Sequence, residues 1–289
     1  KAYQKADSND VYLYDMMTER YDILNIIEKE LIQNKELFGE LQQGTLDDPA
    51  ISMESVHHFY KEVSGVPTIR PAWYYDVEQQ GEGIADVTTH LIDLVNWKCF
   101  PEEAIDYKRD INVLYATHWP TKISLDEFTK STRQTEFPNF LRKHVKDSFL
   151  HVYANGIIHY QVKGTNVAVK VQWNFQAPDG GGDTFNSSIK GTKAVLKTCQ
   201  DKQENYVKQL YIQKNDKISS KKFEKNLQKT IEKIQIAYPF VTLARPLPDG
   251  SVRIDIPLEK RVGHEEHFKH VAQQFFEYLA NRNMPDWEI

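Results

Sequence analysis

The chain has 289 residues, of which 40% are hydrophobic and 27% charged, a composition typical of a globular protein with one large domain or one and a half. Its formal net charge of −5 offers no basic surface for a phosphate backbone, so we expect no nucleic-acid partner. No run approaches the roughly 18 uninterrupted apolar residues of a membrane span. The two cysteines, Cys99 and Cys199, lie far apart, so we expect small buried apolar residues rather than a disulfide or a nucleophile.

The first half of the chain alternates strand-like and helical patterns. The expected elements are a strand at 11–15, a helix opened by Thr18 and Glu19 that runs to Leu31, a short strand between Gly39 and Gly44, a strand at 56–63, a helix at 83–97, a β segment at 105–116 and two short helical segments within 124–146. Pro101 ends the helix at 83–97, because proline has no backbone N–H to continue it.

The second half is dominated by strand patterns. Asn155-Gly156 favours a type I′ turn, which predicts a hairpin between strands at 149–153 and 157–162. Further expected elements are strands at 167–175, 184–190 and 194–198, an amphipathic helix through Phe223, Leu227, Ile231 and Ile234, a hairpin turning at Pro248-Asp249-Gly250, and a final helix at 264–279. Together they predict an α+β fold, a large and predominantly antiparallel open-faced sheet with helices on one face. A single strand–helix unit precedes this sheet, too little to form a Rossmann fold.

The helix expected at 83–97 carries the clearest chemical pattern. At about 100° per residue, Asp86, His90 and Asp93 fall within a sector of roughly 60°, apart from an apolar arc on the same helix. This grouping suits proton transfer, because imidazole titrates near neutral pH and a neighbouring carboxylate stabilises its charged form. On spacing alone, a solvated helix face with an incidental acid–histidine pair is the alternative interpretation.

The segment Gly81-x-Gly83-x-x-Asp86-x-x-x-His90-x-x-Asp93 is similar to the substrate-domain motif of the Gfo/Idh/MocA oxidoreductases, which are NAD(P)-dependent dehydrogenases of sugars, inositols and related polyols. Further stretches resemble the family in the same order along the chain. Residues 12–20 resemble the last Rossmann strand and the turn after it. Phe38-Gly39 resembles the entry into the open-faced sheet, and Trp173 together with residues 191–196 resembles a late strand pair of the family. There is also a narrower resemblance, to the C-terminal domain of a subgroup of putative bacterial oxidoreductases. It rests on residues 15–20, 56–60, 70–73 and 86–90.

The resemblance implies two regions, a remnant of a dinucleotide-binding domain at 1–36 and a C-terminal substrate-binding and oligomerisation domain at 37–289. It implies that His90 is the general base toward a substrate hydroxyl, and that Asp86 orients His90 or binds the substrate. Asp93 either braces the helix or contributes to substrate binding. Arg20 either forms a plain salt bridge or contributes to cofactor binding at the domain junction.

Three more side chains are candidates for substrate binding. Arg70 and Trp73 precede the motif closely enough to enter the pocket, where arginine binds hydroxyls or a carboxylate and tryptophan stacks on a sugar. A core position is the alternative for Trp73, since tryptophans are mostly buried. His57 and His58 follow each other in a strand, so we expect them to point to opposite faces. His58 is the ligand-facing candidate, with a structural role as the alternative.

Two parts of the family's machinery have no counterpart in this sequence. They are the lysine of a Lys-Pro turn and a G-x-G-x-x-G segment opening a helix, which the Gly180-Gly181-Gly182 loop does not replace. We therefore expect NAD or NADP to bind the full-length protein, no cofactor to bind this chain, and the chain alone to be inactive. Thr88 also departs from the family, which usually has glycine there, and the added side chain puts dehydrogenase chemistry in question.

The remaining expectations concern metals, partners and location. His264, His267 and His270 lack the i, i+4 pair that zinc proteases use, so we expect no metal site. A wide uncovered sheet face predicts a homodimer or larger assembly. The sequence begins at Lys1 and not at a methionine, and we expect it to be a piece of a longer protein. The cytoplasm and the bacterial cell envelope are both possible locations. The alternative to an enzyme is a non-catalytic carbohydrate-binding or scaffold module that kept the fold.

Overall fold

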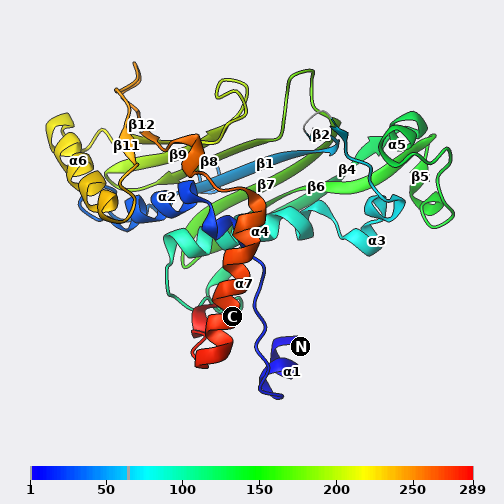
Figure 1. Cartoon of the computed structure of the whole chain (residues 1–289), viewed down its shortest axis with the longest axis horizontal. Helices are drawn as coiled ribbons and strands as arrows, with labels where there is room; N and C mark the ends of the chain where they lie inside the picture. Colours follow the sequence, from blue (N-terminus) through cyan, green and yellow to red (C-terminus); the bar gives the residue numbers. More distant parts are fainter. Residues whose placement is uncertain (1, 64–65, 289) are drawn as a thin grey trace.

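The computed structural model describes residues 2–63 and 66–288. Its elements in chain order are α1 (Ala2–Asp7), η1 (Thr18–Tyr21), α2 (Ile23–Gln33), β1 (Ile51–Tyr60), β2 (Glu62–Val63), β3 (Val66–Pro67), η2 (Ala72–Tyr75), α3 (Val77–Gln80), α4 (Gly83–Cys99), β4 (Ile111–Ile123), α5 (Leu125–Thr132), η3 (Arg142–His144), β5 (Val145–Lys146), β6 (Phe149–Val162), β7 (Thr165–Gln176), β8 (Thr184–Lys190), β9 (Ala194–Gln200), β10 (Gln209–Lys214), α6 (Ser220–Ala237), β11 (Thr242–Leu243), β12 (Val252–Asp255), η4 (Leu258–Lys260), α7 (His264–Asn281) and η5 (Asp286–Glu288). Helices labelled η are 3-10 turns. Figure 1 shows one broad sheet with α2, α4 and α6 beneath it, and α7 and α1 projecting away from it.

A 10-stranded sheet forms the body of the protein. Its strand order is β11-β12-β10-β9-β8-β1-β7-β6-β4, with β5 paired to β6 off this path. Within the described residues, every strand pair in this sheet is antiparallel except β1 with β7. The predicted α+β fold with a large, mostly antiparallel sheet is therefore confirmed.

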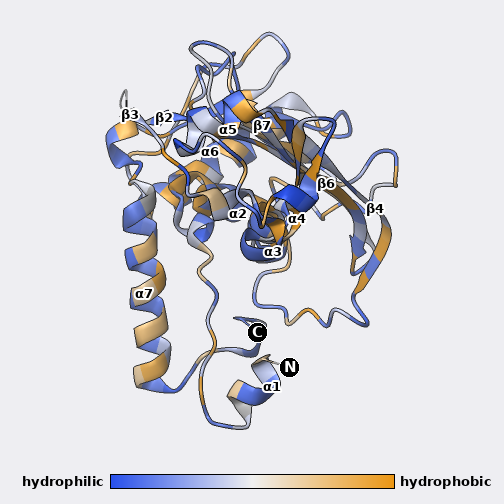
Figure 2. Ribbon diagram, turned by 90° about the vertical axis from the view of Figure 1, so that its right-hand side faces the viewer, coloured by the Kyte–Doolittle hydropathy of each residue, from blue (hydrophilic) through white to orange (hydrophobic). Residues whose placement is uncertain are grey.

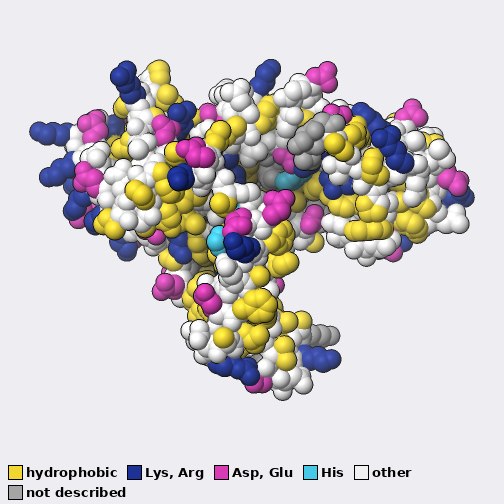
Figure 3. Space-filling model, in the orientation of Figure 1, with side chains coloured by type: hydrophobic (Ala, Val, Ile, Leu, Met, Phe, Trp, Pro, Cys, Tyr) yellow, Lys and Arg dark blue, Asp and Glu magenta, His cyan; other side chains and the backbone are white. Residues whose placement is uncertain are grey.

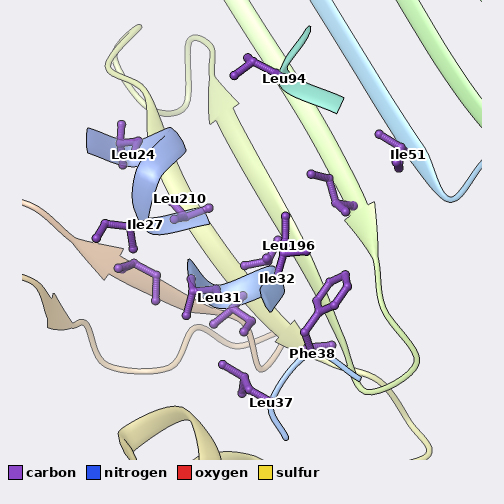
Figure 4. Close-up of a cluster of buried hydrophobic side chains, with 14 of the residues drawn as sticks. Leu24, Ile27, Leu31, Ile32, Leu37, Phe38, Ile51, Leu94, Leu196 and Leu210 are labelled. Atoms are coloured by element: carbon purple, nitrogen blue, oxygen red, sulfur yellow. The ribbon is translucent and has the colours of Figure 1, made fainter. Parts of the chain in front are cut away.

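The helices cover one face of this sheet. Most alternate residues of β6, from Leu150 to Val162, and those of β7, from Val167 to Trp173, are buried on the face that the helices cover. In the core, Leu24, Ile27 and Leu31 of α2 meet Leu196 of β9 and Leu210 of β10 (Figure 4). Helix α2 lies in the predicted dinucleotide-domain remnant, yet it packs into the same core as the sheet, and the division near residue 36 stays a prediction.

A buried ion pair joins the helices to the sheet from inside the core. Lys98 of α4 and Glu28 of α2 are both 0% exposed, and the Lys98 Nζ donates to the Glu28 Oε2 at 2.5 Å. The same ammonium donates to the Asn25 Oδ1 at 2.8 Å, and Thr198 of β9 donates to the second Glu28 oxygen at 3.3 Å. Burial of each charge is tolerated because both are paired and hydrogen-bonded. The pair fixes α4 relative to α2 and β9.

The N-terminal part differs from the prediction in one respect. Residues 11–17 have no regular secondary structure and pair with no strand, so the expected strand at 11–15 is wrong. Their aromatic side chains pack on α7 instead, with Tyr14 ring centroids 6.1 Å from Phe275 and 5.7 Å from Tyr278. Figure 2 shows this helix standing apart from the sheet, with hydrophobic and hydrophilic residues interleaved along it. The expected helix from Thr18 forms as η1 followed by α2.

The hairpin predicted at Asn155-Gly156 is also wrong, because β6 runs without a turn from Phe149 to Val162. The chain reverses at Lys163 and Gly164, whose φ values of 48° and 81° supply the positive dihedrals of a tight turn. Gly156 serves a different purpose. An added Cβ would lie 2.5 Å from the Ile84 Cδ1, so glycine lets α4 approach the strand closely.

Two smaller differences concern strand ends. The strand expected between Gly39 and Gly44 is only an isolated bridge from Leu41 to Gly191. The β segment expected from residue 105 begins at Ile111. The other predicted strands and helices form within a few residues of their expected bounds.

Gly156→Ala should lower the free energy of unfolding by about 1–3 kcal/mol, because the methyl group overpacks against Ile84. Urea denaturation measures the change. Gly182→Ala is the matched control, since its Cβ would meet only Tyr206 at 3.5 Å, an ordinary contact distance. In an Ile84→Ala background the cost of Gly156→Ala should largely disappear, and an unchanged cost there would show that the contact with α4 is not its cause.

Candidate functional site

A cavity of about 400 Å³ lies between α4 and the sheet. Its lining residues are Thr18, Glu19, Ser55, His57, Asp86, Val87, His90, Leu91, Leu94, Trp173, Asp183, Thr184, Phe185, Gln200 and Lys208. Helix α4 forms one wall of the cavity. The opposite wall is formed by strands β1, β7 and β8 together with Asp183, which directly precedes β8. The space-filling view shows a hollow near the centre of this face, with acidic and histidine side chains at its rim (Figure 3).

The N-terminal half of α4 is pressed closely onto β6, which places the motif residues at the cavity. A Cβ on Gly83, the first residue of α4, would lie 1.8 Å from the Ala154 carbonyl oxygen. No side chain fits there, so the helix start is set by backbone contact. Asp86 and His90 follow one turn apart on the same side, and the structure brings both to the cavity wall.

Among the described residues, no hydrogen bond joins Asp86 to His90. The Nδ1 of His90 is buried in the protein and has no hydrogen-bond partner there. Thr88 is 1% exposed and does not line the cavity, because it lies about 200° around the helix from Asp86. The threonine that departs from the family pattern therefore does not narrow this pocket.

Asp183 organises the sheet wall of the cavity. Its carboxylate accepts hydrogen bonds from Nδ1 of His57 at 3.2 Å, from Nδ1 of His58 at 3.0 Å, and from the Lys61 Nζ. Burial alone would raise the pKa of Asp183, but these three hydrogen bonds and the Lys61 charge hold it well below its usual range. The two histidines were expected to point to opposite faces, and they line different pockets, His57 the cavity beside α4 and His58 a separate one. Both reach the same carboxylate because Asp183 precedes the first β8 residue and lies beside the end of β1.

Ser55, Trp173 and Lys208 also belong to the site. The Ser55 Oγ lies 2.6 Å from Nε2 of His57, and the Trp173 ring stacks on that imidazole with centroids 5.0 Å apart. The Lys208 Nζ donates to Asp22 at 2.7 Å and to Glu19 at 3.3 Å. Burial alone would lower the pKa of Lys208, but these two carboxylates raise it, so this side chain stays charged.

Sequence reasoning missed Ser55 and Asp183. Ser55 and His57 are two apart on one strand, which is the spacing that puts two side chains on the same face. That signal was available. Asp183 is 126 residues from His57, and only the pairing of β8 with β1 brings it there.

The remaining candidates lie outside this cavity. Arg70 donates to the Phe59 carbonyl at 2.9 Å, and its guanidinium carbon lies 4.2 Å from the Tyr74 ring centroid. Trp73 is 46% exposed. His58 is 4% exposed and lines a separate polar pocket of about 470 Å³ that also includes Asp183. Their roles in binding stay predictions.

Arg20 and Asp93 form an ion pair outside this cavity. The Arg20 Nε donates to Asp93 at 2.9 Å and its Nη1 to Glu288 at 2.7 Å. The three line a second, mainly apolar hollow of about 460 Å³. The pair braces α4 against η1 and the C-terminal η5, which leaves Asp93 directed away from Asp86 and His90.

Two features bear on metal and cofactor binding in the described part of the chain. No group of three or more His, Cys, Asp or Glu residues there could hold a metal ion, and the side chain of His264 lies outside what is described. Gly180–Gly182 connect β7 to β8 and open no helix, so they do not offer a pyrophosphate the helix N-terminus that it needs. None of the helices described is long and apolar enough to cross a membrane.

A family model described as "Putative oxidoreductase C terminal domain" matches residues 27–289. The chain belongs to this family. That membership confirms the narrower resemblance, to the C-terminal domain of a subgroup of putative oxidoreductases. No curated protein matches the chain.

A solved structure, a "putative oxidoreductase" from Parabacteroides merdae, is 44% identical with a TM-score of 0.96, and the match covers 99% of this chain and 65% of that one. The chain therefore spans less than two thirds of that relative. An oxidoreductase from Sinorhizobium meliloti (13% identity, TM-score 0.46, 99% of this chain and 59% of that one) and a "putative oxidoreductase" from Thermotoga maritima (16%, 0.44, 80% and 56%) are too distant to carry an argument.

Asp183→Asn should cost stability in a pH-dependent way. A carboxyl whose pKa is depressed by folding stabilises the protein above its unfolded pKa of about 3.9, and this contribution is lost as pH falls. The difference in unfolding free energy between wild type and variant should therefore shrink from about pH 5 towards about pH 2. Urea titrations across this range measure it, with Asp179→Asn in the same exposed loop as control. A difference that is constant with pH would contradict the role of the charge.

Proposed function

We propose that this chain is the substrate-binding part of an NAD(P)-dependent oxidoreductase that acts on a sugar, a polyol or a derivative. The observation that carries the proposal is the cavity in which Asp86 and His90, one turn apart on α4, face polar groups of the sheet. In a chain of this family, that arrangement fits the oxidation of a carbinol. The polar side chains among its lining residues suit the hydroxyl groups of a polyhydroxylated ligand.

His90 acts as the general base in this proposal. Histidine is the side chain that most often serves as a general base, and His90 lines the cavity in which the substrate would bind. Asp86 accepts a hydrogen bond from a ligand hydroxyl or stabilises the imidazolium after proton transfer. Trp173 provides an aromatic wall, against which the C–H face of a sugar ring packs.

The nicotinamide is held by the rest of the full-length protein, since Gly180–Gly182 do not form a pyrophosphate site. When bound, it would accept the hydride from the carbinol carbon. The part played by this chain is to bind the substrate, orient its hydroxyl and take up the proton.

We also propose assembly into a homodimer or larger oligomer through the open sheet face. Apolar burial is not the argument for the central strands of this face, because they carry mostly polar and small side chains. Those of β1, β7 and β8 are Ser52, Glu54, Val56, Ala168, Lys170, Gln172, Asn174, Asn186 and Ser188. A partner there would pair through hydrogen bonds and charge, and light scattering of the chain tests this.

Binding of NADH separates the chain from the whole protein. A fluorescence titration should find no NADH binding to residues 1–289 and binding to a version extended upstream, because a pyrophosphate needs a glycine-rich turn at a helix N-terminus. Measurable NAD(P)-linked oxidation by the chain alone would contradict the proposal. If neither form binds, a non-catalytic carbohydrate-binding module becomes the better account.

His90→Ala in the extended protein, screened against polyols, should lower turnover by about 10²–10⁴-fold and leave substrate binding largely intact, because only the proton-transfer step loses its base. His159→Ala, on the outer face of β6, is the control. Equal losses of binding and turnover would assign His90 to binding instead of catalysis. A protein that shows no turnover with any polyol would favour the carbohydrate-binding module.

A further inference from the structure

The wall of the cavity opposite α4 contains a second histidine, held between a hydroxyl and a carboxylate. The Ser55 Oγ lies 2.6 Å from Nε2 of His57, and Nδ1 of His57 lies 3.2 Å from the Asp183 Oδ2. All three residues line the cavity that Asp86 and His90 line. A hydroxyl next to a base that is itself oriented by a carboxylate is the arrangement in which the three act as one unit.

The hydrogen-bond partners determine where the protons lie. Asp183 also accepts from His58 and Lys61, so it is an ionised acceptor and Nδ1 of His57 must carry the proton that it donates. Nε2 of neutral His57 is then a lone-pair acceptor, and the Ser55 hydroxyl donates to it. The Ser55 oxygen keeps its lone pairs for a ligand in the cavity.

The imidazole is held in this orientation from a third side. Trp173 stacks on the His57 ring at 5.0 Å with an interplanar angle of 29°. Trp173 is 7% exposed, and its backbone N–H donates to the Asn155 Oδ1 at 2.7 Å. A ring flip of His57 would break both of its hydrogen bonds, so the protonation pattern is built into the site.

We propose that Ser55, His57 and Asp183 form a proton relay that serves a second hydroxyl group of the ligand, across the cavity from the hydroxyl served by His90. This inference rests on the proposed function for the role of His90. The ligand O–H proton passes to the Ser55 Oγ while the Ser55 proton passes to Nε2 of His57, and the O–H electron pair stays on the ligand oxygen as an alkoxide. Its negative charge is balanced by the His57 imidazolium, which Asp183 stabilises without taking up the proton. The ligand class is a polyol or sugar that presents one hydroxyl to each wall.

Phenylboronic acid tests the relay without nicotinamide or turnover. In sugar-free buffer, the Ser55 Oγ forms a bond to the trigonal boron as its proton moves to His57, and the boron becomes tetrahedral. Boron NMR of the wild-type chain should show this tetrahedral species. Ser55→Ala should abolish it, and His57→Gln and Asp183→Asn should weaken binding by more than about tenfold. Ser187→Ala is the matched control, because Ser187 is also 6% exposed but its hydroxyl has no partner among the described residues.

Long-range ¹H–¹⁵N NMR of the histidine rings tests the proton positions in the unmodified chain. The relay requires His57 to be the Nδ1–H tautomer at mildly alkaline pH, and this preference should be lost in Asp183→Asn. The opposite tautomer would overturn the proposal, as would boron that stays trigonal or a tetrahedral species that survives Ser55→Ala. If the boron adduct forms while the extended protein binds no NADH, the relay stands and the oxidoreductase function fails.

Discussion

The buried contact between Lys98 and Glu28 is the constraint on which the site geometry depends. An ammonium and a carboxylate with 0% exposure cannot separate without leaving an uncompensated charge in the core. Their partners on α2 and β9 extend the constraint to the sheet. Because α4 is held at this end by charge and at its other end by the approach of Gly83 to β6, the two motif residues have little freedom to move.

The two walls of the cavity are built on different principles. On α4, Asp86 and His90 are positioned by the helix and are not hydrogen-bonded to each other. On the sheet, the Asp183 carboxylate collects three hydrogen-bond donors, from His57, His58 and Lys61. The first wall can reorganise around a ligand, whereas the second is already organised before a ligand arrives. A site of this kind fixes the position of one part of the ligand and lets the reacting part adjust.

The sequence predicted the fold well wherever a single period ran for many residues. The helix 83–97, the strand 184–190 and the final helix all form as expected, because their apolar spacing is set locally. The strand at 11–15 was wrong because its aromatic residues pack on a helix instead of a sheet. The predicted hairpin at residue 155 was wrong because Gly156 is required by a long-range contact with Ile84 of α4. Rules based on neighbouring residues do not include such a contact.

The same limit applies to the site. Asp86 and His90 were predicted because both are on one helix, and the cavity does contain them. Arg70 and Trp73 were assigned by nearness to the motif in sequence, and neither lines this cavity. Asp93 was predicted from the same helix face, with bracing of the helix as one possible role, and it pairs with Arg20. Asp183 could not be predicted, since its neighbours come from a strand more than a hundred residues earlier and depend on how β8 pairs with β1.

The Asn155-Gly156 dipeptide also affects how the protein ages. In an unfolded chain, the amide nitrogen after asparagine attacks the side-chain carbonyl and releases ammonia, and glycine at the second position offers no steric resistance. Here the Asn155 amide donates to the Trp119 carbonyl and the Thr121 hydroxyl, both at 2.9 Å, and accepts from the Trp173 N–H at 2.7 Å, so ring closure must first break all three bonds. Once an unfolded molecule has deamidated, it carries a carboxylate where the fold needs a donor. Folding therefore protects this dipeptide from deamidation. Each time the protein unfolds, deamidation of Asn155 can prevent it from refolding to the same structure.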